Sequence, residues 1–216
     1  GANLRGASLD GANLGGADLT AAILDGAKMA EVIIDGAEFC GTRLREAQLS
    51  KMLVRSTELR DVDLSDACLE GVTFIEMTFL GLVAERVSLE QCTFLQSQIA
   101  GANFSGAVLD RAAFIEVDAS GASFAEAKIG TICFLMGANL AGASFAGAKI
   151  QAGGFRQASL SASRFDGARV EVGDFSKMGA ELLFVLRRAN RIGGRLHDVG
   201  GIPTAITMCV WSMTIV

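Results

Sequence analysis

The sequence predicts an all-β fold in which short strands wind into a stacked solenoid, and three observations support this prediction. A large apolar residue recurs at every fifth position, from Leu4 to Phe134 and, after a six-residue step, from Leu140 to Phe175. The residue two positions earlier is small, usually Ala, and polar residues flank the large one on both sides. Glycine is frequent at the last position of each pentad.

A period of five fits strands better than helices. An α-helix turns by about 100° per residue, so apolar residues at this spacing would form no stripe along it. In a strand, residues two apart share a face, so Ala and the large residue point inward while their neighbours point outward. Glycine after them suits a corner. One pentad cannot bury its apolar face alone, so the pentads must stack.

The phenylalanines set the number of sides. They recur at intervals of 20 residues, which predicts four pentads per coil and a ladder of like residues inside the rod. The six-residue step between Phe134 and Leu140 contains one residue too many, which we expect a corner bulge to absorb. The first ladder comprises Phe74, Phe94, Phe114 and Phe134, followed by Phe155 and Phe175.

The pentads ANLRG, ASLDG, ANLGG, ADLTA and ANFSG resemble the A(D/N)LXX motif of the pentapeptide-repeat family. The resemblance covers residues 1 to about 178 and implies a right-handed quadrilateral β-helix. Larger residues replace Ala in the middle of the chain. Leu82 and Val117 are each followed two residues later by a small central residue, Ala84 and Ala119, which conserves core volume.

Residues 179–216 form a second region, which we expect to be a capping helix and an apolar tail. Residues 181–192 have their large apolar residues on one side and are followed by Gly193 and Gly194, a typical helix stop. Such a helix would cover the open end of the core. The run 204–216 is too short to span a bilayer. It either packs back on the rod or joins another chain.

Charge and cysteine content limit the function classes. The formal net charge is −5, and the repeat region holds 22 acidic and 15 basic residues, which excludes a nucleic-acid partner and leaves a basic partner open. The five Cys include no C-x-x-C pair, so we expect neither a zinc site nor a disulfide framework. The expected compartment is the cytoplasm. Residue 1 already lies inside a repeat, so a longer protein with a targeting segment stays open.

No cluster of residues predicts catalysis. The only histidine, His197, lies in the tail and is expected to be a surface or loop residue. The sequence contains no phosphate loop, no Cys–His pair and no metal-ligand cluster, so we expect no enzyme activity, no cofactor and no metal.

Two outward rows are candidate binding surfaces. Glu70, Glu90 and Asp110 form an acidic strip, interpreted as a solvated face or, alternatively, as a docking strip. The second row is apolar and of the kind that marks an interaction site. Two alternatives to an interaction site are that the tail covers this row or that its members are ordinary scattered surface residues. The apolar row comprises Ile75, Leu95, Ile115 and Leu135, with Leu80 round the corner.

The favoured function is a non-catalytic scaffold, a rigid rod that presents surfaces to a protein partner. An analogy with repeat segments in secretion-associated bacterial proteins, including type VI accessory proteins and effectors, leaves open that it is the repeat segment of a larger bacterial protein. The alternative is a DNA mimic that binds DNA gyrase or another topoisomerase, as implied by the family's quinolone-protecting members. Those members dimerise through a C-terminal segment, so a homodimer is also open. The modest, mixed charge weighs against mimicry.

Overall fold

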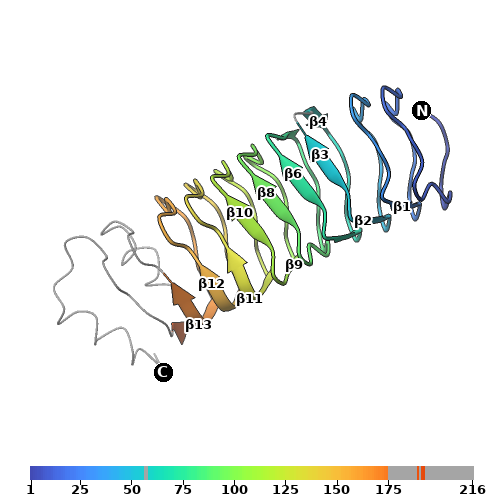
Figure 1. Ribbon diagram of the computed structural model, residues 1–216. Helices are drawn as coiled ribbons and strands as arrows, with labels where there is room; N and C mark the ends of the chain where they lie inside the picture. Colours follow the sequence, from blue (N-terminus) through green and yellow to red (C-terminus); the bar gives the residue numbers. More distant parts are fainter. Residues whose placement is uncertain (56–57, 175–188, 190, 193–216) are drawn as a thin grey trace, which may run out of the picture.

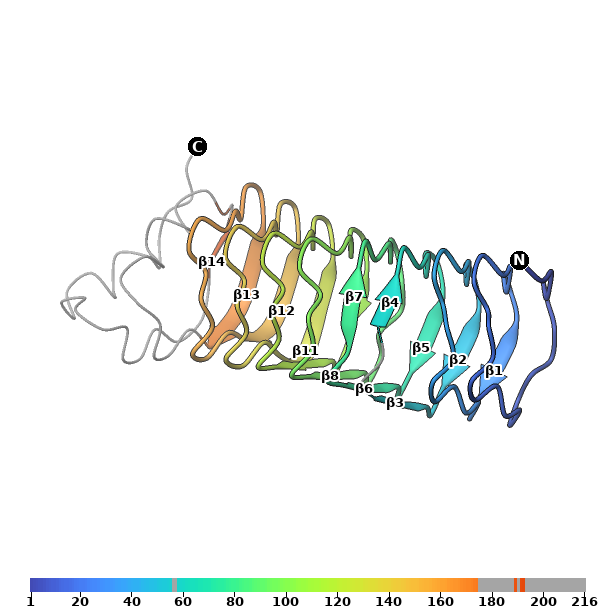
Figure 2. The ribbon, with the colours of Figure 1, turned by 90° about the horizontal axis from the view of Figure 1, so that it is seen from above.

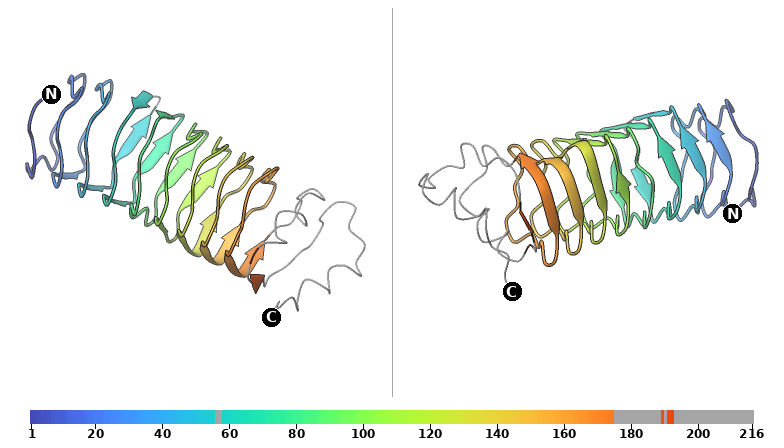
Figure 3. Two further views of the ribbon diagram at one scale, coloured as in Figure 1. Left: turned by 180° about the vertical axis from the view of Figure 1, so that it is seen from behind. Right: turned by 90° about the horizontal axis from the view of Figure 1, so that it is seen from below.

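The computed structural model describes residues 1–55, 58–174, 189, 191 and 192, which form a rod of stacked coils (Figure 1). The N-terminus lies at one end of the rod and β13 and β14 at the other (Figures 2 and 3). All strand pairs are parallel, and the described residues contain no helix. The strands are β1 (Lys28–Ala30), β2 (Gln48–Ser50), β3 (Leu53–Arg55), β4 (Glu58–Arg60), β5 (Cys68–Glu70), β6 (Thr73–Ile75), β7 (Thr78–Leu80), β8 (Thr93–Leu95), β9 (Val108–Leu109), β10 (Ala113–Ile115), β11 (Lys128–Phe134), β12 (Lys149–Gly154), β13 (Arg169–Asp174) and β14 (Arg191–Ile192).

Each coil has four sides and 20 residues, as the phenylalanine spacing predicts. Bridges join Asn3 to Ile23 and Ile23 to Arg43, and the step becomes 21 where the extra residue lies between the partners, as from Asp118 to Asn139 and from Ser123 to Ser144. The right-handed quadrilateral β-helix is confirmed. We name the four faces by their central inward residues. Face A runs from Leu4 to Phe165, face B from Leu9 to Val170, face C from Leu14 to Phe155 and face D from Leu19 to Leu160.

Local hydrogen bonds explain why the pentad folds this way. The amide of Ala7 donates to the Leu4 carbonyl at 3.0 Å, which closes the turn, and the amide of Arg5 donates to the Asn3 side chain at 3.2 Å. The corner residue between them has a positive φ, 65° at Gly6. Glycine adopts this conformation without strain, which explains its frequency at this position.

The core consists of two inward residues from every pentad. Phe94 and Phe114 stack with ring centroids 4.8 Å apart, and Phe114 meets Phe104 of the opposite face edge-on. The paired substitutions also fit, since Leu82 and Ala84 are both buried. No buried side-chain nitrogen or oxygen among the described residues lacks a hydrogen-bond partner. The interior is therefore filled by stacked rows of like side chains.

The position of the extra residue differs from the sequence prediction. Ala113 pairs with Phe134, so Phe134 occupies the place before the central one, and Leu135, 1% exposed, is the core residue between Phe114 and Phe155. The pairing of β11 with β12 shifts between Thr131 and Cys133, so the bulge lies inside β11 and not after Phe134. Both frames offer a large apolar central residue, Phe134 or Leu135, so periodicity could not choose between them.

The C-terminal region is described only in part. Arg191 and Ile192 pair with Arg169 and Val170 of β13, so these two residues form a strand and their assignment to a helix was wrong. Ala189 packs against the core. The rest of the expected helix, the boundary at 178/179 and the apolar run 204–216 lie outside the described residues.

The revised frame can be tested at two adjacent residues. Leu135→Ala should lower the free energy of unfolding by about 2–5 kcal/mol, because it leaves a cavity in the core. Met136→Ala, at an outward position, should change it by about 0.5 kcal/mol or less. Urea unfolding followed by circular dichroism measures both. A loss at Leu135 as small as that at Met136 would restore Phe134 to the core.

Candidate interaction surfaces

An apolar strip follows the outward side of face C. Ile75 pairs with Leu95 and Leu95 with Ile115, each in the next coil, and all three side chains are half-buried. The next residue of this row is Met136, 37% exposed, whose carbonyl accepts a hydrogen bond from the Glu116 amide. We call Ile75, Leu95, Ile115 and Met136 the face C strip (strands β6, β8 and β10 in Figure 1).

One predicted member of the strip is wrong. Leu135 is a core residue and cannot contact a partner, because the bulge in β11 shifts the frame by one position. Leu80, at the end of β7, is 41% exposed on the neighbouring face D, as expected. The strip therefore keeps its length, with Met136 in place of Leu135.

Sequence reasoning missed a second apolar row on the same face. Ile33 and Leu53 lie in consecutive coils at the other outward position of face C and are 49% and 48% exposed. The signal was present, because both residues precede the central residue of their pentads. The predicted strip, however, comes from the column that follows the central residue. Together with the face C strip, they make an apolar surface that extends along most of this side of the rod.

Charged residues mark the ends of the face C strip. Arg55 precedes Ile75 in the same outward row, and Arg156 follows Met136. Asp35 lies one coil before Arg55, and all three charged residues are exposed. The row therefore reads Asp35, Arg55, four apolar residues and Arg156.

The predicted acidic strip is stacked on face B but is partly neutralised. The backbone links Glu70 to Glu90 and Glu90 to Asp110 through the corner residues of successive coils. Arg111 pairs with Glu90 and also with Asp110, at 3.3 Å. Two of the three carboxylates thus share one guanidinium. This arrangement favours a solvated surface over an acidic docking strip.

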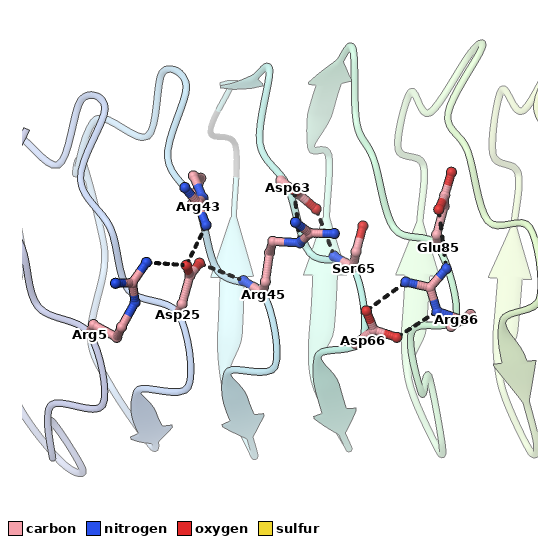
Figure 4. A network of polar contacts seen from close by, with 9 residues as sticks. All are labelled: Arg5, Asp25, Arg43, Arg45, Asp63, Ser65, Asp66, Glu85 and Arg86. Atoms are coloured by element: carbon pink, nitrogen blue, oxygen red, sulfur yellow. Dashed lines mark hydrogen bonds and ion pairs between the residues drawn. The ribbon is translucent and has the colours of Figure 1, made fainter.

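Face A, opposite face C, carries a network of ion pairs (Figure 4). Asp25 accepts hydrogen bonds from Arg5 at 3.2 Å and from Arg43 at 2.6 Å. Arg45 pairs with Asp63 at 3.4 Å. Exposed pairs of this kind contribute little to stability, about 0–1 kcal/mol each. Their effect is to satisfy the charges of neighbouring coils within the chain itself.

The network continues at the corner between faces A and B. Arg86 donates two hydrogen bonds to Asp66, at 2.7 and 2.6 Å, and contacts Glu85 at 3.2 Å (Figure 4). The hydrogen bonds from Arg86 lower the pKa of Asp66, and Asp66 in turn raises the pKa of Arg86. The charged side chains drawn in Figure 4 are all paired within the chain.

The described residues contain no group of three or more His, Cys, Asp or Glu residues that could hold a metal ion. The same part of the chain has no helix that is long and apolar enough to cross a membrane. His197 lies outside it. Cys92 replaces an inward Ala on face C, and its Sγ donates to the Leu69 carbonyl at 2.6 Å. Burial raises the pKa of Cys92 to about 12, so this thiol is a core residue.

Thiol labelling at pH 8 tests these positions. Cys40 and Cys68 are exposed, whereas Cys92 is buried. Burial and the nearby Glu70 and Glu90 raise the pKa of Cys68, which lowers its thiolate fraction. We expect labelling by iodoacetamide to be fastest at Cys40, slower at Cys68 and absent at Cys92 until denaturant is added. Peptide mapping by mass spectrometry gives the rates. Native labelling of Cys92 as fast as that of Cys68 would contradict its inward position.

Comparisons with known proteins identify the family of the repeat. A family model described as pentapeptide repeats, with 8 copies, matches residues 1–34, 22–55, 41–74 and 92–129. No curated protein sequence matches the chain. Among solved structures, it is similar to HetL, a protein involved in heterocyst differentiation regulation in the cyanobacterium Nostoc sp. strain PCC 7120. The identity is 26%, with 92% of this chain and 84% of HetL covered and a TM-score of 0.40.

Two further structures are similar in the same way. A trypsin-treated form of QnrB1, a plasmid-mediated fluoroquinolone resistance protein, is 20% identical over 91% of this chain and 96% of its own, with a TM-score of 0.36. Rfr23 from the cyanobacterium Cyanothece 51142 is 16% identical over 57% of this chain and 87% of its own, with a TM-score of 0.36.

Proposed function

The chain belongs to the pentapeptide-repeat family, and we propose that it is a non-catalytic scaffold that binds a protein partner through face C. The observation that supports this proposal is the unequal distribution of apolar side chains. Face C carries the face C strip together with Ile33 and Leu53, whereas five charged residues of face A are paired within the chain: Arg5, Asp25, Arg43, Arg45 and Asp63. A protein surface is the partner that an apolar, uncharged row of this size fits best.

The energetics support an interaction of useful strength. Full burial of a Leu, Ile or Met side chain contributes roughly 1.5–3 kcal/mol, and the half-buried residues of the strip would gain part of that. The backbone hydrogen bonds between coils fix the spacing of these side chains, about 4.8 Å from coil to coil. Because the surface is already ordered, binding costs little conformational entropy.

The alternative function, a DNA mimic that binds gyrase, requires unpaired carboxylates along the rod. Arg111 pairs with Glu90 and Asp110, which reduces the charge that such a partner could recognise. We therefore prefer the apolar docking scaffold.

The exposed free thiols Cys40 and Cys68 support a reducing compartment such as the cytoplasm.

Charge substitution on two opposite faces tests the proposal. Leu95→Asp/Ile115→Asp should abolish binding of the apolar dye ANS by the dilute protein and the retention of partners from a cell lysate, because it places two carboxylates in the strip. The matched control is Ala125→Asp/Ala146→Asp, at the equivalent half-buried outward positions of face A. This control variant should still bind ANS and still retain the same partners. Identical ANS binding and identical retained proteins for the two double variants would contradict a binding role of face C.

A further inference from the structure

We propose that the partner of face C is a second copy of this chain, packed face to face and antiparallel about a two-fold axis at the level of Leu95. The inference rests on the proposed function, because it requires face C to be a binding surface. It is carried by the order of residues along the outward rows of face C. Two copies of a surface pack symmetrically only where the surface is complementary to itself.

The two outward rows decide the orientation. For two flat faces, the two-fold axis lies in the plane between them, with the sheets about 10 Å apart. An axis parallel to the rod would set one row against the other, which places Ile33 opposite Asp35 and Leu53 opposite Arg55. An axis parallel to the strands reverses the coil order and sets each row against itself. In the second orientation, Ile33 and Leu53 no longer lie opposite Asp35 and Arg55.

The charges then decide the register. With the axis at Leu95, this residue meets its own copy and Ile75 meets Ile115. One coil further out, Arg55 lies opposite Met136, where its aliphatic stem can cover the thioether while the guanidinium reaches the rim. Two coils further out, Asp35 lies opposite Arg156, and symmetry creates this ion pair twice. The apolar centre of the row is thus closed at both ends by opposite charges.

Neighbouring registers are worse for a definite reason. An axis half a coil along, between Leu95 and Ile115, places Arg55 opposite Arg156 at both ends of the interface. An axis at Ile115 places Ile75 opposite Arg156. The first shift disfavours association because like charges lie in direct opposition, and the second separates Asp35 from Arg156. Asp35 and Arg156 take part in no ion pair recorded for the described residues, so both remain able to pair between copies.

The area predicts a weak dimer. From Asp35 to Arg156 the row crosses six coil steps, about 29 Å, and three strand residues span about 10 Å. With the corner side chains included, each copy would bury roughly 300–600 Å², which is less than the ~800 Å² per partner of a standard interface. Association is therefore expected at micromolar concentrations and above, and to weaken as salt rises.

Charge reversal tests the register. Asp35→Arg should weaken self-association roughly tenfold, because each Asp35–Arg156 pair becomes a pair of like charges. Asp35→Arg/Arg156→Asp should restore it, since the pair is then reversed. Glu126→Arg, an exposed corner residue beside face A, makes the same change of charge away from the interface and should have no effect. Sedimentation equilibrium over a range of protein concentrations measures all four proteins.

The other outcomes are distinguishable. Self-association that survives Leu95→Asp/Ile115→Asp, or a charge reversal without rescue, would overturn the dimer. A parent protein that is monomeric at every concentration, yet loses ANS binding in the double variant, would overturn the dimer and leave the proposed function intact. Trp211, the only Trp, reports on the tail. Blue-shifted emission of the monomer that turns red in the double variant would show that the tail occupies face C, which also overturns the dimer.

Discussion

The parallel hydrogen-bonded register between coils is the constraint on which the rest of the structure depends. The backbone amides of the central residues and of the outward residues before them bond to carbonyls one coil away, as from Leu4 to Ile23 and from Ile23 to Ala2. The register places like residues above like, so Phe94 stacks on Phe114 inside the rod. The same register stacks the outward side chains. A substitution on the surface therefore acts as part of a row, never as an isolated residue.

This constraint explains how much of the fold could be predicted from the sequence. Five-residue periodicity and the 20-residue spacing of Phe follow directly from the two-residue alternation of strands and from four equal sides, and both predictions were right. The insertion was harder to place, because the core accepts either Phe134 or Leu135 as its central residue. What decides between them is the pairing of β11 with β12, a contact between segments that periodicity alone does not encode.

The candidate site was predicted less completely than the fold. Ile75, Leu95 and Ile115 were found because they follow the central residues in consecutive coils. Ile33 and Leu53 lie in the other outward row, in coils where the first row carries Asp35 and Arg55. Searching one row at a time could not reveal that the apolar surface passes from one row to the other along face C. The course of the apolar surface depends on which side chains are exposed, and exposure depends on neighbours in three dimensions.

A rod with an apolar face must also avoid indiscriminate association, and the arrangement of charges addresses this need. Arg55 and Arg156 interrupt the face C strip at both ends, so a shift of the apolar row along another copy either opposes like charges or separates Asp35 from Arg156. On face A, the pairing of Asp25 with Arg5 and Arg43 satisfies the charges within the chain, which leaves that side little to offer a partner. Specificity here arises from where charges interrupt a regular surface, because the regular surface itself is repeated in every coil. The repeat thus supplies rigidity and spacing, and the few departures from it distinguish one face from another.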